Sequence, residues 1–234
     1  MRRVLTTVLA VAVLLGLGAL AVLALPNGGA PLAGAPAVSA AAPEFQDAPE
    51  ATLATNKYNM IAMPLNAANQ FTSAGQSFNA AGMAAIVGSG VQQVLSWNPN
   101  TSSYLSYVPG LGGDNFNLAV GGAYWLELDS TAGSIVSFVG DVPAQGTIKN
   151  TLVRPASGNC VYNDISIPLD QSSVTTPQQL ADAIGNVEQV LQWNATTQSF
   201  LQFVPGLGGD TFNVKIGYPY TVCLQPGSST TWPQ

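Results

Sequence analysis

Apolar and polar residues alternate along much of this chain with the two-residue period of a β-strand. In residues 162–169 (YNDISIPL), Ile165 and Ile167 alternate with polar residues, and a proline ends the run. Residues 58–65 (YNMIAMPL) have the same form. Further strand-like runs follow with few residues between them, which favours antiparallel pairing. The pattern predicts a mainly β fold.

Helical periodicity is confined to short stretches. In residues 176–184, Thr176 can cap a helix, and Gln179 stands three positions later, as in a capping box. A proline suits the first turn of this helix. Its buried face would consist of Leu180, Ala183 and Ile184. Residues 80–86 show a looser version of the same pattern, so we expect one short helix beside each set of strands.

A duplication dominates the sequence. Residues 91–117 (VQQVLSWNPNTSSYLSYVPGLGGDNFN) recur without a gap as residues 187–213 (VEQVLQWNATTQSFLQFVPGLGGDTFN). Each copy predicts a strand ending in Trp-Asn, an aromatic return strand and a glycine-rich loop. The duplication indicates two copies of one module, spanning residues 57–153 and 154–234. The predicted fold class is mainly β (α+β), with two homologous antiparallel β modules, each with one short helix, arranged as a pseudo-symmetric tandem pair.

The N-terminal part has the composition of an export segment. Arg2 and Arg3 precede a charge-free apolar run, so residues 1–25 are predicted to be a signal peptide. Small residues favour cleavage near Ala40, with retention as a membrane anchor as the alternative. Residues 26–56 are rich in Pro, Ala and Gly and predict a disordered tether. We therefore expect the protein to be extracellular or at the cell surface.

The cysteines agree with export. Cys160 and Cys223 are the two cysteines of the chain, and such a pair in an exported protein predicts a disulfide. The first copy has Asn56 and Glu127 at the equivalent positions, so the bridge would be specific to the second module. A redox or metal-binding pair is less favoured, because the spacing is not CxxC.

Composition excludes several functions. Charged residues make up 8% of the chain, the formal net charge is −6, and there is no histidine. A nucleic-acid partner would need clustered Lys and Arg, and is excluded. Without histidine, Ser-His-Asp and Cys-His catalysis is excluded, and a zinc site is disfavoured. The sequence has no phosphate-binding glycine motif. We expect no cofactor and no metal.

Aromatic residues of the duplicated stretch are candidates for stacking on sugar rings. They are Trp97, Tyr104, Tyr107, Trp193, Phe200 and Phe203. Packing between sheets is the alternative, and two observations favour it. Tyr104 and Tyr107 lie three residues apart, so they cannot share one face of a regular strand. Both hydroxyls are also lost in the second copy, where the equivalent residues are phenylalanines.

The aspartates of the PGLGGD loops are a second candidate ligand-binding set. Asp114 and Asp210, together with loop carbonyls, could hold Ca²⁺. Calcium takes roughly six to eight oxygen ligands, usually with several carboxylates, whereas each loop offers one. A turn in which the aspartate hydrogen-bonds its own backbone is therefore favoured.

The order of motifs carries a resemblance. In both copies YNxIxxPL is followed by VxQVLxWN, an aromatic strand, PGLGGDxF and Gly-x-x-Tyr. Over residues 57–234 this resembles tandem β-rich modules of large exported proteins from Chloroflexota-type bacteria. The resemblance implies a module that accompanies surface, adhesive or carbohydrate-active domains. It implies no catalytic or ligand residues.

Together these features predict a non-catalytic secreted or cell-surface protein that makes protein or glycan contacts. Its expected partners are extracellular polysaccharide or surface proteins, and membrane contact is expected only through an uncleaved N-terminal segment. Two alternatives stay open. One is a secreted carbohydrate-active enzyme that uses paired carboxylates, and the other is a membrane-anchored structural subunit.

Overall fold

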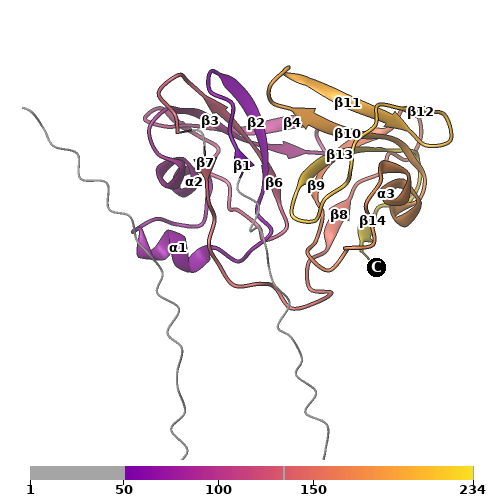
Figure 1. Ribbon diagram of the computed structural model, residues 1–234, viewed down its shortest axis with the longest axis horizontal. Helices are drawn as coiled ribbons and strands as arrows, with labels where there is room; N and C mark the ends of the chain where they lie inside the picture. Colours follow the sequence, from indigo (N-terminus) through magenta and orange to yellow (C-terminus); the bar gives the residue numbers. More distant parts are fainter. Residues whose placement is uncertain (1–50, 134, 234) are drawn as a thin grey trace, which may run out of the picture. The chain divides into compact units, whose positions relative to one another are not determined.

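The computed structural model describes residues 51–133 and 135–233. The predicted signal peptide (1–25) and residues 26–50 of the predicted tether lie outside the described residues. The described part is mainly β, with antiparallel sheets and three short helices (Figure 1). The predicted fold class is confirmed.

The first module is built on a five-stranded antiparallel sheet. Its strands are β2 (Lys57–Ala62), β3 (Val91–Asn98), β4 (Ser103–Val108), β5 (Gly112–Gly113) and β6 (Ala123–Leu128). They pair in the order β2-β6-β3-β4-β5. Trp97 pairs with Tyr104 across β3 and β4, so the Trp-Asn strand and the aromatic strand form a hairpin, as predicted.

The second module repeats this sheet. Its strands are β9 (Val161–Ser166), β10 (Val187–Asn194), β11 (Ser199–Val204), β12 (Gly208–Gly209) and β13 (Pro219–Leu224). They pair in the equivalent order, β9-β13-β10-β11-β12. Even the irregularities recur, because β3 and β10 both shift register at equivalent positions. In both sheets the YNxIxxPL strand lies at one edge.

Each module also has a two-stranded ribbon. The strands are β1 (Ala51–Thr52), β7 (Ile135–Val136), β8 (Asn150–Leu152) and β14 (Thr230–Trp232). Strand β1 pairs with β7, and β8 pairs with β14.

The ribbons move the module boundaries from the positions that the sequence suggested. Because β8 pairs with the last strand of the chain, the second module begins near Asn150 rather than at residue 154. Residues 51–56, assigned to the tether from composition, belong to the first module, where Leu53 is buried. The composition of the longer segment concealed this short apolar contact.

The helices are α1 (Ala68–Ser73), α2 (Ala80–Val87) and α3 (Pro177–Ile184). Helix α3 begins with the predicted capping box, in which the hydroxyl of Thr176 accepts from the backbone N–H of Gln179 at 3.2 Å. Helix α2 is capped by the side chain of Asn79. Helix α1 is an addition of the first module, in the longer stretch that joins its first two large strands.

Each module has its own hydrophobic core, which one face of its sheet shares with its helices. The first core includes Ile61, Phe71, Met83, Val94 and Leu126, and the second includes Ile165, Leu180, Val190, Val222 and Trp232. The opposite face of each sheet therefore needs another partner.

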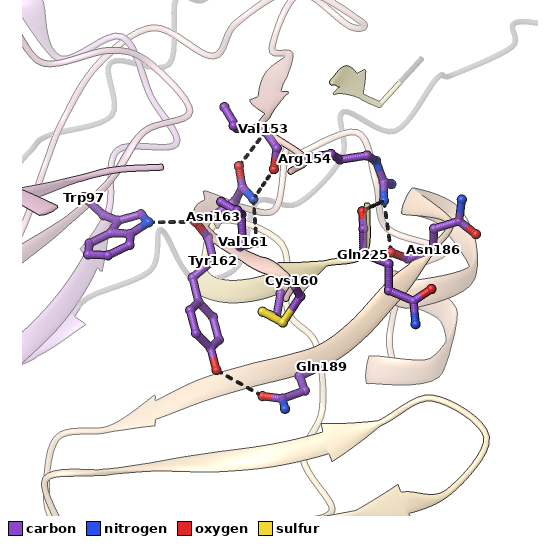
Figure 2. The surroundings of a disulfide bond; sticks show 11 residues. Trp97, Val153, Arg154, Cys160, Val161, Tyr162, Asn163, Asn186, Gln189 and Gln225 are labelled. Atoms are coloured by element: carbon purple, nitrogen blue, oxygen red, sulfur yellow. Dashed lines mark hydrogen bonds between the residues drawn. A yellow bond between two sulfur atoms is a disulfide. The ribbon is translucent and has the colours of Figure 1, made fainter. Parts of the chain in front are cut away.

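A buried asparagine ties each edge strand to the segment before it. Asn163 Nδ2 donates to the carbonyls of Val153 (2.9 Å) and Val161 (3.1 Å), and its Oδ1 accepts from the N–H of Val153 at 2.7 Å (Figure 2). Asn59 makes the equivalent three bonds in the first module. Buried amides must have their polar atoms paired, which explains the asparagine of the YN motif.

Cys160 and Cys223 form the predicted disulfide, with their Cα atoms 5.4 Å apart (Figure 2). Cys160 directly precedes β9, and Cys223 lies on β13, where it pairs with Tyr162. The bridge therefore holds the start of the edge strand against its neighbour. None of the helices in residues 51–133 and 135–233 is long and apolar enough to cross a membrane.

Replacing Cys160 and Cys223 together by alanine should lower the free energy of unfolding of the second module by about 3–4 kcal/mol, because the bridge closes a long loop. Urea unfolding followed by tryptophan fluorescence measures this change. Reduced wild-type protein is the control and should lose a similar amount. Equal stability of the variant and the oxidised wild type would contradict a constraining role for the bridge.

Candidate functional site

The two modules pack together through the sheet faces that point away from their cores. Strand side chains alternate between the two faces of a sheet, so Trp125 faces away from the core that holds Tyr124 and Leu126. Its ring lies 5.1 Å from that of Trp193 and 6.0 Å from that of Phe200, both in edge-to-face arrangement. Aromatic side chains thus fill the interface between the modules.

Two reciprocal hydrogen bonds relate the modules by a pseudo-two-fold axis. The indole N–H of Trp97 in the first module donates to the carbonyl of Tyr162 on β9 at 2.7 Å (Figure 2). The indole N–H of Trp193 in the second module donates to the carbonyl of Tyr58 on β2 at 2.9 Å. Residues 97 and 193 are equivalent in the duplication, as are residues 58 and 162. The same interaction therefore occurs twice, as in an isologous dimer interface.

Other contacts differ between the two sides of the interface. On the β2 side, the side-chain amide of Gln198 donates to the carbonyl of Tyr58 at 2.9 Å and accepts from its N–H at 2.9 Å. The ammonium group of Lys57 donates to the carbonyl of Thr196. The turn between β10 and β11 is thus tied to the exposed edge of β2.

On the β9 side, a carboxyl group joins the modules. Asp164 Oδ2 accepts from the indole N–H of Trp125 at 2.8 Å, and Oδ1 accepts from the hydroxyl of Thr221. Burial raises the pKa of Asp164, while the hydrogen bonds from Thr221 and Trp125 oppose the rise. Burial and the charge of Asp164 raise the pKa of Tyr104 to about 12. Asp164 occupies the position of Met60 in the first module, so this contact breaks the pseudo-symmetry.

A cavity of about 430 Å³ opens between the modules on the β2 side. Strand β2 and the residues after it form one wall, and β10, β11 and the loop before β13 form the other. The aromatic residues Trp193, Tyr218 and Phe138 line it together with Gln192 and Asn194, and none of the lining residues is charged. A largely apolar cavity of this size with a few polar groups is typical of a site for a small neutral molecule.

The structure brings four of the predicted aromatic residues to the interface. Trp97 and Tyr104 stack edge to face with centroids 4.9 Å apart, as do Trp193 and Phe200 at 5.0 Å. Of these four, Trp193 also lines the cavity. Tyr104 keeps 45% of its surface exposed. A role of these four residues in ligand binding stays a prediction.

The remaining candidates lie elsewhere. Tyr107 and Phe203 pack against the two cores, on the opposite sheet face from Tyr104 and Phe200. The carboxylates of Asp114 and Asp210 accept from the backbone N–H groups of Ser106 (3.2 Å) and Gln202 (2.8 Å). These N–H groups lie eight residues before the aspartates, on β4 and β11, so each carboxylate bonds the preceding strand and not the backbone of its own turn. Among the described residues, no group of three or more His, Cys, Asp or Glu could hold a metal ion.

Most cavity residues were missed at the level of sequence. The two copies differ in sequence at several positions that line the cavity, so a comparison of the copies could have indicated these residues. Tyr218 stands where the first copy has Gly122, and Gln192 stands where it has Ser96. Of the aromatic residues at equivalent positions of the duplicated stretch, Trp193 lines the cavity.

Comparison of the chain with protein-family models, curated proteins and solved structures finds no match. The interface and its cavity are therefore the features from which a function can be inferred.

The raised pKa of Asp164 predicts a pH dependence of stability. Its folded pKa lies above the ordinary value of 3.8. Its contribution to stability is therefore fully present below that value and is lost as pH rises through the folded pKa. Asparagine does not ionise, so Asp164→Asn lacks this pH dependence. Between about pH 4 and pH 7 the free energy of unfolding of wild type should therefore fall relative to that of Asp164→Asn, by at most about 1.4 kcal/mol per pH unit.

Urea unfolding across this pH range measures the difference between the two proteins. Asp182→Asn, on the exposed face of α3, controls for the loss of one negative charge. Parallel stability curves for Asp164→Asn and wild type would show that Asp164 is not held in a desolvated position.

Proposed function

We propose that this chain is an exported, non-catalytic binding protein that takes a neutral glycan unit in the cavity between its modules. The observation that carries the proposal is the cavity lining, in which aromatic and amide-bearing residues occur together without a charged residue. Sugar rings offer apolar C–H faces that pack on aromatic rings and hydroxyls that pair with amides and carbonyls. The extracellular partner would be a polysaccharide or a glycosylated surface.

Export is supported by two features. The disulfide is of a kind that persists in oxidising compartments, and the N-terminal sequence has the form of a signal peptide. Whether the apolar N-terminal run is cleaved or retained as an anchor changes where the protein is displayed, but not the proposed site.

A non-catalytic role is favoured over glycan hydrolysis by the position of the carboxylates. Glycoside hydrolysis uses two carboxyl groups on either side of the scissile bond. No Asp or Glu lines the cavity, and the carboxyl of Asp164 is bonded to Trp125 and Thr221. The enzyme alternative would therefore need a site other than the cavity.

Contact with surface proteins is the second candidate. The observation in its favour is that Leu111 and Leu207, at the tips of the two PGLGGD loops, are each 88% exposed. Exposed apolar side chains at equivalent places in both modules could anchor a partner. One leucine per loop is small against the area of a stable protein interface, so we favour the glycan site.

The proposal predicts that the oxidised protein binds neutral glycans on a glycan array, and that Tyr218→Ala weakens binding of the best ligand by about 30-fold in calorimetric titration, the size expected for an aromatic anchor. Leu111→Ala is the matched control: it removes a large apolar side chain that does not line the cavity, and should bind like wild type.

Two results would contradict the cavity as the site. One is a Tyr218→Ala variant that keeps full affinity, and the other is a Leu111→Ala variant that loses it. The second result would support the loop tips as the contact surface.

A further inference from the structure

The interface between the modules contains a buried hydroxyl on one side. On the β9 side, the hydroxyl of Ser166 in the second module donates to the carbonyl of Gly121 in the first module at 2.8 Å. Ser166 has none of its surface exposed. This bond lies between the edge strand of one module and the loop before the last sheet strand of the other.

The backbone around the equivalent place on the β2 side is the same. The duplication equates Ala62 with Ser166 and Gly217 with Gly121. Both glycine N–H groups donate to the residue after the edge strand at 2.7 Å, Gly121 to Met63 and Gly217 to Ile167. The carbonyl of Gly217 is thus held as its counterpart is, but residue 62 is an alanine and has no hydroxyl to donate to it.

Ala62 and Gly217 both line the cavity. The cavity therefore opens at the place where the other side of the interface has a serine hydroxyl. The β9 side shows which chemical group suits a glycine carbonyl in this setting, namely an uncharged O–H donor.

We infer that the ligand itself supplies this hydroxyl, donating to the carbonyl of Gly217 while its ring packs against Trp193 and Tyr218. This inference rests on the proposed glycan-binding function and narrows it to a neutral pyranoside with a free hydroxyl at the inner end of the site. A fully apolar molecule would leave a buried carbonyl without a donor, which weakens binding. An anionic sugar would place its charge beside lining residues that carry none.

The test compares Ala62→Thr with Ala62→Val. The two side chains have nearly the same shape and are both suited to a strand, but only threonine can occupy the donor position as Ser166 does. The probes are the methyl glycosides of glucose, galactose, mannose and N-acetylglucosamine, titrated by saturation-transfer NMR. Ala62→Thr should weaken binding of the best probe about tenfold more than Ala62→Val does, the cost of losing one hydrogen bond.

A matched control uses the other side of the interface. Ser166→Ala removes the hydroxyl that donates to the carbonyl of Gly121 on the β9 side. Ser166 does not line the cavity, so the affinity for the best probe should be unchanged. Thermal unfolding of all three variants confirms that each is folded. Deoxy versions of the best probe, each lacking one hydroxyl, test the same bond. One of them should bind wild type about tenfold more weakly than the best probe does. The affinity of that deoxy probe should be the same for wild type and for Ala62→Thr.

The outcomes separate this inference from the proposed function. Equal affinities of Ala62→Thr and Ala62→Val, with probe binding still sensitive to Tyr218→Ala, would overturn the hydroxyl assignment and leave the glycan site in place. Failure of the wild-type protein to bind any of the neutral probes or any neutral array glycan would overturn both.

Discussion

The arrangement of this protein depends on two indole N–H groups that pair with the edges of two sheets. A sheet edge presents unpaired carbonyl and N–H groups, which proteins must cover or protect. Trp97 and Trp193 each donate to the edge strand of the other module, and each indole ring also covers apolar surface of the interface. Because this interaction occurs twice about a pseudo-two-fold axis, the same indole contact pairs one carbonyl on each of the two sheet edges.

The two sides of the interface differ because the two copies differ in sequence at their edge strands. Asp164, Thr221 and Ser166 close the interface on the β9 side. Met60 and Ala62 stand opposite the second module on the β2 side, where the cavity lies. Perfect symmetry would have closed both sides or opened both. The two edge strands differ at these positions, and the edge strand of the first copy is the one that faces the cavity.

Much of the fold could be predicted from the sequence, because the responsible interactions are local. The capping box of α3 and the hairpin that pairs Trp97 with Tyr104 follow from residue types at short spacings. The disulfide joins residues 63 positions apart, and it could be predicted because the chain has two cysteines. The separation of Tyr104 from Tyr107 onto opposite faces follows from strand periodicity alone. The pairing of β8 with β14 could not be predicted, since it joins short segments far apart in the chain. The cavity was missed for the same reason, because it depends on how two modules pack and not on a motif within either.

The pairing of the two modules is tested most directly by hydrogen exchange of the tryptophan indole N–H groups, observed by NMR in the oxidised protein. Trp97, Trp125 and Trp193 each donate an indole N–H across the interface, and four tryptophans give four resolvable signals. These three groups are expected to exchange slowly and together, at the rate at which the modules separate. Exchange of Trp97 and Trp193 as fast as in an unfolded chain, while both cores stay protected, would contradict the pairing of the modules.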